Sequence, residues 1–435
     1  MPFRLATTDA DFDDAFARFL ASKREVSPDV DQSVARIISD VRQRGDAALL
    51  DYTRRFDGID LSVLGLRIEA DEIKAAVRAC DPATLEALAL AKARIEAYHV
   101  RQLPKDEFFR DSLGAELGWR WSPIESVGLY VPGGLASYPS SLLMNAVPAK
   151  VAGVPRIAMA VPAPQGAINP SVLAAADMVG LTEIYRLGGA QAVAAFAYGS
   201  QSLTPVAKVI GPGNAYVAAA KRQVFGTVGI DAIAGPSEVL VIADRHNDEA
   251  WLAADLLAQA EHDSAAQAIL MTDDAEFADR VEGELERQLR LLPRSDIAAA
   301  SWREFGAVII LATLDQAPQL ADRIAAEHVQ IVTRDPDRLA SQIRNAGAIF
   351  LGAFTPEVIG DYLAGSNHVL PTARSARFAS GLGVLDFMKR TSVLRLDAAA
   401  LRQLAAPTMT LARAEGLTAH ERSVAVRLGP AADRP

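Results

Sequence analysis

Four of the six histidines stand beside another side chain that can bind a metal or move a proton. Imidazole nitrogens together with carboxylate or amide oxygens form a ligand set that suits zinc. A histidine beside a glutamate can also exchange protons near neutral pH, because the unperturbed pKa of imidazole is about 6.5. The four clusters are Gln259-Ala260-Glu261-His262, Glu327-His328, Gly360-Asp361 with Asn367-His368, and Glu415 with His420.

Each cluster taken singly also has a plain structural interpretation. A histidine next to a carboxylate is more often a solvated or hydrogen-bonded pair than a metal site. The spacing of Gln259 and His262 matches no recognised zinc signature. Adjacent polar residues such as Glu327 and His328 are common at helix ends. His99 and His246 are expected on the surface or in packing, so the chemistry depends on whether the other four clusters meet in space.

The cluster at Gln259 and His262 ends a continuous turn, strand and helix over residues 230–262. Residues 238–243 form a short apolar run that is typical of a buried parallel strand. Two leucines mark the buried face of the helix that follows, and Gln259 falls next on that face. His262 lies three residues further on, so the two side chains are neighbours on the helix surface. Gln259 and His262 are polar at positions where the apolar face of the helix should continue. They therefore need a partner, which is either a structural neighbour or a group that takes part in chemistry.

The chain alternates short apolar strands with helical stretches from about Ser126 onward, which predicts parallel sheets built from βαβ units. The alternating run divides near residues 234–237 into two halves of similar composition. Residues 1 to about 120 and the tail after Asp397 are expected to be mainly helical, with one possible strand at Leu66–Ala70. The other predicted strands are Val127–Val131, Arg156–Val161, Glu183–Leu187, Ala207–Ile210, Ile230–Ile233, Glu238–Ala243, Ala268–Thr272, Ala307–Leu311, His328–Val332 and Ala348–Leu351.

The clusters of the second half fall at helix-to-strand junctions, which share the amino-terminal edge of a parallel sheet. Ser237 precedes a strand and joins the same edge. In the first half, glycine-containing turns follow the strands, at the carboxyl edge where α/β sheets usually bind ligands. We therefore expect an α/β protein with two Rossmann-like parallel-sheet domains that face each other across a cleft. The three turns are Tyr130-Val131-Pro132-Gly133-Gly134, Gly188-Gly189-Ala190-Gln191 and Gly211-Pro212-Gly213-Asn214, none of which reads G-x-G-x-x-G.

Composition excludes several classes of protein. The net charge is −10 and no basic cluster is present, which argues against a nucleic-acid partner. The single cysteine, Cys80, rules out a disulfide framework within the chain. The longest uncharged run, residues 127–149, contains three prolines and a Gly-Gly pair that would break a membrane span. We expect a soluble cytoplasmic protein without a signal peptide.

Taken together, these motifs resemble one family, histidinol dehydrogenase, over nearly the full length of the chain. The upstream motifs are Tyr130-Val131-Pro132-Gly133-Gly134, Gly211-Pro212-Gly213-Asn214, Ile230-Asp231 and Ala234-Gly235-Pro236-Ser237-Glu238. The downstream motifs are Asp255-Leu256-Leu257, Gln259-Ala260-Glu261-His262, Glu327-His328, Asn367-His368-Val369-Leu370-Pro371-Thr372 and Glu415-Gly416-Leu417-Thr418-Ala419-His420.

The resemblance implies a zinc-dependent, NAD-linked, four-electron oxidation of L-histidinol to L-histidine through a bound aldehyde, the last steps of histidine biosynthesis. The implied metal ligands are Gln259, His262, Asp361 and His420, and the implied catalytic residues are Glu327 and His328. The implied NAD contacts are Tyr130, Gln191 and Asn214. The implied substrate contacts are Ser237, Gln259, His262, His328, Asp361, Glu415 and His420.

The resemblance also implies a homodimer with shared active sites, in which Glu415 and His420 reach the site of the other subunit. We expect a helical N-terminal segment at residues 1–26 and a small helical C-terminal domain at residues 386–435. Between them we expect an NAD-binding domain at residues 127–237 and a zinc and substrate domain made of residues 27–126 and 238–385.

Two rival hypotheses remain. A related enzyme could use the same zinc and NAD to oxidise another polar alcohol, such as a sulfonated diol. A protein of a different class could bind a metal, or act as a scaffold, without catalysis. Comparing the turnover of histidinol with that of other alcohols distinguishes the first rival from a histidinol dehydrogenase. Replacement of Glu327 and His328 distinguishes the second rival.

Overall fold

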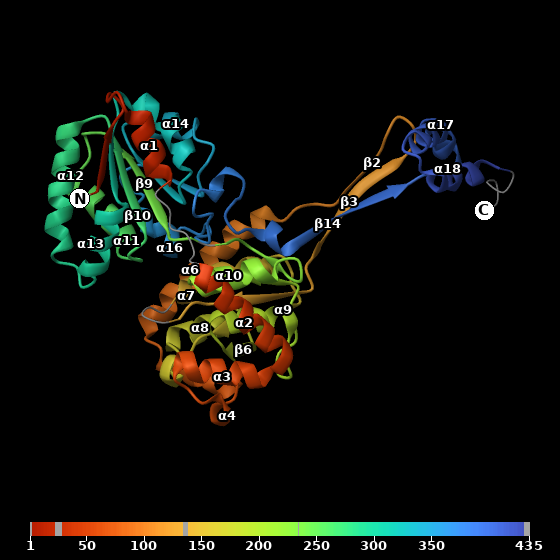
Figure 1. Cartoon of the computed structure of the whole chain (residues 1–435), viewed down its shortest axis with the longest axis horizontal. Coiled ribbons are helices and arrows are strands. Elements are labelled where there is room, and N and C mark those ends of the chain that lie inside the picture. Colours follow the sequence, from red (N-terminus) through yellow and green to blue (C-terminus); the bar gives the residue numbers. More distant parts are fainter. Residues whose placement is uncertain (1, 22–27, 134–137, 234, 430–435) are drawn as a thin grey trace. The chain divides into compact units, whose positions relative to one another are not determined.

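The computed structural model describes residues 2–21, 28–133, 138–233 and 235–429 of the 435-residue chain (Figure 1). The chain forms two compact units. The first unit comprises Met1–Gln102 and Glu125–Asp386, and the second comprises Leu103–Ile124 and Phe387–Pro435. Gly134 and Ala234, which belong to two of the predicted turns, lie outside the described residues.

The first unit contains two parallel sheets. One sheet has six strands in the order β1-β11-β10-β9-β12-β13, and each neighbouring pair runs parallel. Its strands are β1 (Phe3–Ala6), β9 (Glu238–Ala243), β10 (Gln267–Thr272), β11 (Ala307–Ile310), β12 (His328–Val332) and β13 (Ala348–Leu351). Alternate residues of the central strands pack on opposite helical layers, so these strands are buried on both faces. Helices α11, α12 and α13 cover one face, and α1, α14 and α15 cover the other (Figure 1).

The second parallel sheet has five strands in the order β6-β5-β4-β7-β8. Its strands are β4 (Ser126–Tyr130), β5 (Arg156–Val161), β6 (Glu183–Arg186), β7 (Lys208–Ile210) and β8 (Gly229–Ile230). The chain winds outward from β4 to β6 and then returns to place β7 on the other side of β4. This reversal between β4 and β7 is a topological switch point, where open α/β sheets bind ligands at the carboxyl ends of their strands.

Helices connect most strands, and their bounds follow the caps in the sequence. Asp248, for example, accepts a hydrogen bond from the backbone N–H of Ala250 and caps the start of α11. The helices of the first unit are α1 (Phe12–Ala21), α2 (Pro28–Arg44), α3 (Asp46–Asp57), α4 (Leu61–Leu64), α5 (Ala70–Ala79), α6 (Pro82–His99), α7 (Pro139–Val151), α8 (Pro170–Met178), α9 (Gly189–Tyr198), α10 (Ala215–Val224), α11 (Glu249–Ala260), α12 (Ala275–Leu289), α13 (Ser295–Phe305), α14 (Ala317–Ile324), α15 (Pro336–Ala340) and α16 (Val358–Tyr362).

The second unit is a three-stranded antiparallel sheet followed by two helices. The strand order is β14-β3-β2, with β2 (Glu107–Arg110), β3 (Glu116–Pro123) and β14 (Met388–Arg395). The helices α17 (Ala398–Ala414) and α18 (Thr418–Ala425) pack against each other. This unit therefore joins two segments that are far apart in the sequence.

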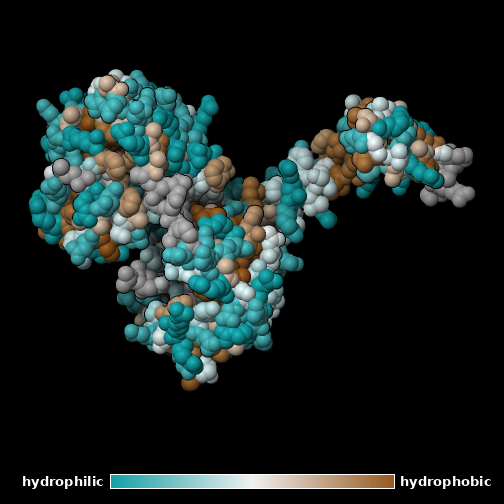
Figure 2. All heavy atoms as spheres, in the orientation of Figure 1, coloured by the Kyte–Doolittle hydropathy of each residue, from teal (hydrophilic) through white to brown (hydrophobic). Residues whose placement is uncertain are grey.

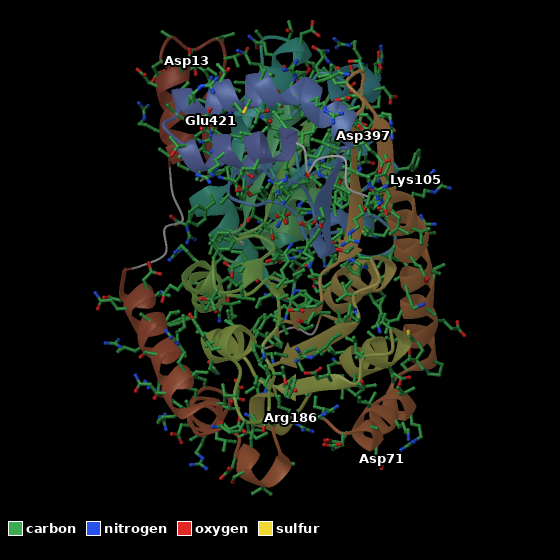
Figure 3. All side chains as sticks on the ribbon, turned by 90° about the vertical axis from the view of Figure 1, so that its right-hand side faces the viewer. Asp13, Asp71, Lys105, Arg186, Asp397 and Glu421 are labelled. Atoms are coloured by element: carbon green, nitrogen blue, oxygen red, sulfur yellow. The ribbon has the colours of Figure 1, made fainter. Side chains whose placement is uncertain are left out.

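The predicted fold class is confirmed, since both long sheets are parallel and built from βαβ units. The four strands β5, β9, β12 and β13 have the predicted bounds. The segment Leu66–Ala70 is not a strand: it makes only an isolated bridge through Arg67, and α5 begins at Ala70. Arg186 on β6, labelled in Figure 3, holds this region. It donates to the carbonyl oxygen of Arg67 and pairs with Glu72.

The N-terminal region is divided differently from the expected boundaries. Strand β1 pairs with β11, and α1 packs on the six-stranded sheet. Helices α2 and α3 share a hydrophobic core with the five-stranded sheet. The apolar stripe of α2 is buried against α9 and α10 and consists of Val34, Ile37, Ile38 and Val41. Residues 103–124 belong with the C-terminal segment through β2 and β3. Hydrophilic side chains cover much of the face seen in Figure 2, and no described helix is both long and apolar enough to cross a membrane.

Candidate active site

The polar clusters of the second half gather at the amino-terminal edge of the six-stranded sheet. Glu238 begins β9 and His328 begins the neighbouring strand β12, with His328 opposite Val239 in the parallel register. Ser237 and Glu327 immediately precede these two strands. The structure thus brings together the helix-to-strand junctions that the sequence pattern assigned to one edge.

His328 has a defined tautomer. Its Nδ1 lies 3.0 Å from the backbone carbonyl oxygen of Glu238, which can only accept a hydrogen bond. Nδ1 therefore carries the proton, and the lone pair is on Nε2. Burial lowers the pKa of His328 to about 4, so the ring is neutral at physiological pH. A neutral imidazole with Nε2 free can take a proton from a substrate.

Glu327 is anchored to the same backbone residue. Its Oε2 accepts a hydrogen bond of 3.0 Å from the N–H of Glu238 and lies 3.7 Å from Nδ1 of His328. Burial raises the pKa of Glu327 well above its ordinary value. A carboxyl group whose pKa is raised toward neutrality is suited to general acid and base catalysis.

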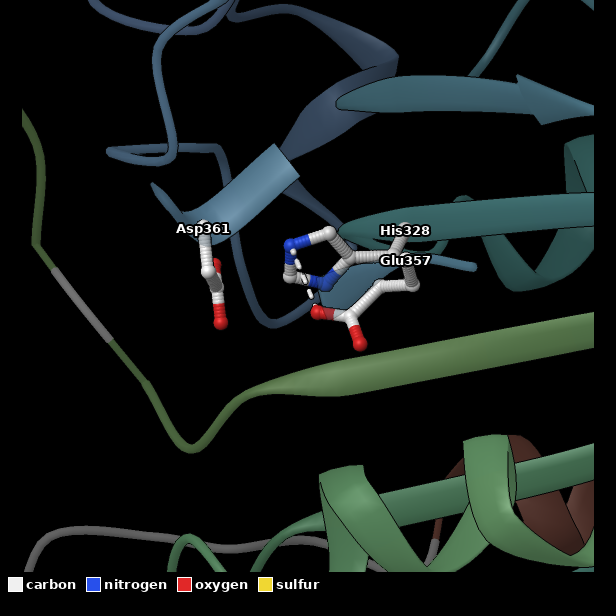
Figure 4. A group of neighbouring side chains, drawn as sticks. All are labelled: His328, Glu357 and Asp361. Carbon is white, nitrogen blue, oxygen red and sulfur yellow. Dashed lines mark ion pairs between the residues drawn. The ribbon is translucent and has the colours of Figure 1, made fainter. Parts of the chain in front are cut away.

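A third carboxyl group, Glu357, completes the surroundings of His328. Its Oε1 lies 3.6 Å from Nε2 of His328, and its side chain is buried (Figure 4). Burial, together with the nearby charges of Asp361 and Asp255, raises the pKa of Glu357 to about 8. The sequence analysis missed this residue. The available signal was its position four residues before Asp361, one helical turn away on the same short segment.

Asp361, on α16, links the remaining histidines. Its Oδ2 lies 3.9 Å from Nε2 of His262, and its Oδ1 lies 3.7 Å from Nδ1 of His368. His368 donates through Nδ1 to the carbonyl oxygen of Asp361, and its Nε2 lies 3.1 Å from Oγ of Ser141 on α7. Burial lowers the pKa of His368. The predicted pair His262 and Asp361 is therefore close in space, and His368 orients the loop beside it.

The side-chain amide of Gln259 is buried without a hydrogen-bond partner among the described residues. Gln259 is 1% exposed at the end of α11, and neither its Oε1 nor its Nε2 has a partner among the described residues. An unsatisfied buried polar group costs about 1–3 kcal/mol, so a side chain kept in this state points to a missing ligand. One turn earlier, Asp255 accepts a hydrogen bond of 2.7 Å from Gln330, and burial raises its pKa to about 6.

Two overlapping groups of residues could hold a metal ion. Ligand atoms of His328, Glu357 and Asp361 lie within 4.8 Å of one another. The predicted group of Gln259, His262 and Asp361 shares the aspartate. The unsatisfied amide of Gln259 favours the predicted group, because Gln259 can gain a partner only from a bound species.

A cavity of about 640 Å³ opens beside His262. Its lining is largely apolar, with Tyr362 and Arg294 as larger polar side chains. A cavity of this size suits a small molecule or an inserted side-chain cluster. The lining residues are Ala83, Thr84, Ala87, Leu88, Ala91, Tyr138, Pro139, Ser140, Glu261, His262, Arg294, Tyr362 and Leu363.

The three predicted NAD residues lie at the carboxyl edge of the five-stranded sheet, after β4, β6 and β7. Tyr130 ends β4, and its hydroxyl accepts a hydrogen bond of 3.1 Å from the N–H of Gly189. Gln191, in the first turn of α9, is buried, and its Oε1 has no partner among the described residues. Asn214 follows β7 and caps α10 by accepting from Tyr216 and Val217. Burial raises the pKa of Tyr130 to about 12, so the phenol stays neutral.

The last two predicted residues lie in the second unit. Glu415 follows the end of α17, and His420 lies in the first turn of α18. Both side chains are exposed. Gly416 between them has a φ of +74°, which closes the turn between the two helices.

These features define a class of protein. A parallel sheet with a topological switch point, together with a buried histidine and glutamate at the edge of a second parallel sheet, is typical of an α/β enzyme. Histidinol dehydrogenase is the family whose model matches residues 20–428. The chain belongs to the histidinol dehydrogenase family of oxidoreductases.

Individual relatives agree with this assignment. The chain is 66% identical over 428 residues to the histidinol dehydrogenase of Rhizobium meliloti strain 1021, covering 98% of this chain and 99% of the relative. It is 65% identical to that of Agrobacterium fabrum strain C58, covering 99% of this chain and all of the relative. The crystal structure of histidinol dehydrogenase from Elizabethkingia anophelis is similar with a TM-score of 0.93 at 33% identity, covering 98% of both chains.

Proposed function

We propose that this protein catalyses the zinc-dependent, NAD-linked oxidation of L-histidinol to L-histidine through bound L-histidinal. The observation that carries the proposal is the environment of His328. Its Nδ1 is held by the carbonyl oxygen of Glu238, and the ring lies beside Glu357 and Asp361, the second of which also lies beside His262. Membership of the histidinol dehydrogenase family supports the choice of substrate.

Zinc would be held by Gln259, His262 and Asp361 together with His420 of the partner subunit. Two nitrogen and two oxygen ligands suit zinc, and a cation would satisfy the buried amide oxygen of Gln259. When bound, zinc would hold the imidazole and amino nitrogens of the substrate as a template rather than polarise the alcohol. The carboxylate of Asp361 is already beside His262 at 3.9 Å.

NAD would bind at the carboxyl edge of the five-stranded sheet, in contact with Tyr130, Gln191 and Asn214. The switch point between β4 and β7 supports this position. The unpartnered Oε1 of Gln191 supports it as well, because a dinucleotide hydroxyl or amide could donate to it.

His328 would act as the base in both oxidations. The carbinol carbon releases hydride only as the hydroxyl loses its proton, and Nε2 of His328 would take that proton while NAD accepts the hydride. The aldehyde must then add water before the second oxidation. Glu327 would take a proton from this water while His328 returns its proton to the aldehyde oxygen, which gives the hydrate. His328 would then again accept a hydroxyl proton of the hydrate while a second NAD accepts the second hydride.

The remaining predicted contacts would complete the substrate site. Ser237 stands directly before Glu238 at the same sheet edge. We propose a homodimer in which Glu415 and His420 of each subunit serve the site of the other, so that neither subunit alone has a complete site.

Comparative turnover tests this function against the nearest rival. The purified protein with zinc and NAD should oxidise L-histidinol with a kcat/KM at least about 100-fold above that for a sulfonated diol. The reason is that the site is built to bind two nitrogen atoms of the substrate, and the diol supplies neither. A preference for the diol, with no NADH from histidinol, would identify the related alcohol dehydrogenase instead.

A further inference from the structure

Gly211 is the tightest point of the loop that follows β7. Its φ is +119°, and a Cβ at this position would lie 2.1 Å from the backbone carbonyl oxygen of Tyr130. Only glycine fits there. The loop that leads to Asn214 therefore begins in direct backbone contact with the end of β4, at the switch point.

Two buried side chains of opposite charge hold both polar backbone groups of Gly211. Nζ of Lys221 donates to the carbonyl oxygen of Gly211 at 3.0 Å. Oδ2 of Asp231 accepts from the N–H of Gly211 at 2.8 Å. Lys221 and Asp231 also pair with each other, and their side chains are 2% and 5% exposed. The orientation of Gly211 is thus fixed from both sides, by one residue of α10 and one that follows β8.

If the Lys221–Asp231 pair served only folding, its desolvation would be an unnecessary free-energy cost. Lys221 lies on the α10 face that buries Val217, Ala218 and Val224, where an apolar side chain would avoid the desolvation of an ammonium group. Buried ion pairs often add little to stability compared with apolar replacements, and are better explained by the geometry that they impose. Here the geometry imposed is that of the loop before Asn214.

We propose that Lys221 and Asp231 are positioning residues for NAD binding. They act through Gly211 by fixing the peptide groups on both sides of this residue, and these peptides set the approach of Asn214 and of the amino end of α10. Neither side chain needs to touch the dinucleotide. The inference rests on the proposed function in one respect, which is that NAD occupies this edge of the sheet.

The test compares KM values for the two substrates. The variants are Lys221→Met, Lys221→Arg and the double variant Lys221→Met/Asp231→Asn, which leaves no buried charge unpaired if a single change prevents folding. The matched control is Arg156→Met, because Arg156 pairs with Glu183 at the opposite edge of the same sheet. Wild-type turnover of histidinol is measured first, so failure of the proposed function is seen before any variant is interpreted.

Lys221→Met and the double variant should raise the KM for NAD by about 10- to 100-fold, which corresponds to the loss of one charge-assisted hydrogen bond. The KM for histidinol and the zinc content should stay within about twofold, and Lys221→Arg should recover part of the NAD affinity because it keeps a donor. Arg156→Met should leave both KM values unchanged. An unchanged KM for NAD in the folded double variant would overturn the inference, as would a parallel rise in both KM values.

Discussion

The Nδ1 atom of His328 lies 3.0 Å from the backbone carbonyl oxygen of Glu238. This contact decides which ring nitrogen can act as a base, because the carbonyl oxygen leaves Nδ1 protonated and Nε2 free. The N–H of the same residue donates to Glu327. The first residue of β9 therefore orients both members of the proposed acid and base pair.

Replacement of His328 by Asn should abolish turnover without removing zinc. The kcat for histidine formation should fall by about 10²- to 10⁴-fold, the usual contribution of a general base. Zinc content, measured on the dialysed protein, should match the wild type. His246→Asn is the control, because His246 follows β9 at the other edge of the sheet and should keep full activity. Loss of zinc together with activity would contradict the assigned role.

Glu327→Gln should block the second oxidation more than the first. The amide oxygen can still accept from Glu238, so the backbone geometry is kept, whereas the base that activates water is lost. In single-turnover experiments, a first equivalent of NADH should form while histidine formation falls by about 10²-fold or more. Equal loss of both steps would place the role of Glu327 elsewhere.

Gln259→Leu should have opposite effects on folding and on metal binding. Removal of the two unsatisfied amide atoms should stabilise the zinc-free protein by about 1–3 kcal/mol in urea denaturation. The same change should lower the zinc content. Gln330→Leu provides the contrast, since Gln330 donates to Asp255 and its loss should destabilise the protein. Zinc retained at wild-type stoichiometry in Gln259→Leu would contradict the proposed ligand set.

The zinc-free protein should lose stability as the pH rises from about 6.5 to 8. The folded-state pKa of Glu357 is raised to about 8, so the folded protein binds a proton that the unfolded chain has released. The stability from this group is present below about pH 4.5 and is lost as the pH rises through 8. His328, whose pKa is lowered, is neutral in the folded state, and the unfolded imidazole loses its proton around its ordinary pKa of about 6.5, so this group opposes the decline only at the lower end of the range.

Denaturant midpoints of chelator-treated protein measure this effect. Glu357→Gln should make the decline between pH 6.5 and 8 shallower, because the amide does not titrate. Glu304→Gln, an exposed control, should keep the wild-type slope. A midpoint that rises with pH in the wild type would contradict the assigned direction.

Mixing two inactive variants should restore activity if the active sites are shared. His420→Ala lacks the tail ligand, which should lower its bound zinc, and His328→Asn lacks the base. After subunit exchange, half of the dimers are mixed and each mixed dimer has one intact site, so activity should recover to about one quarter of the wild type. No recovery after verified exchange would show that His420 does not act across subunits.

The parallel sheets could be predicted because their strands are buried on both faces. Glu238–Ala243 and His328–Val332 are mainly apolar, and polar residues at the start of each one mark the amino edge. The antiparallel sheet of the second unit was not predicted. All residues of β2 and most residues of β14 are exposed, so neither strand shows the alternation of a half-buried strand.

Part of the candidate site could also be predicted from the sequence. His262, Asp361 and His328 stand in recognisable clusters, whereas Glu357 is an isolated acid whose role comes only from the fold. The pairing of Lys221 with Asp231 also could not be predicted, because it depends on the return of the chain from α10 through β8 to Gly211. The orientation of His328 depends on register, since Glu238 is distant from it in the sequence.

The stoichiometry of the reaction tests the central proposal most directly. Purified protein with zinc, a limiting amount of L-histidinol and excess NAD should form two molecules of NADH and one of L-histidine per histidinol consumed, without release of the aldehyde. Formation of a single NADH with free aldehyde, or of no NADH at all, would contradict the proposed four-electron oxidation.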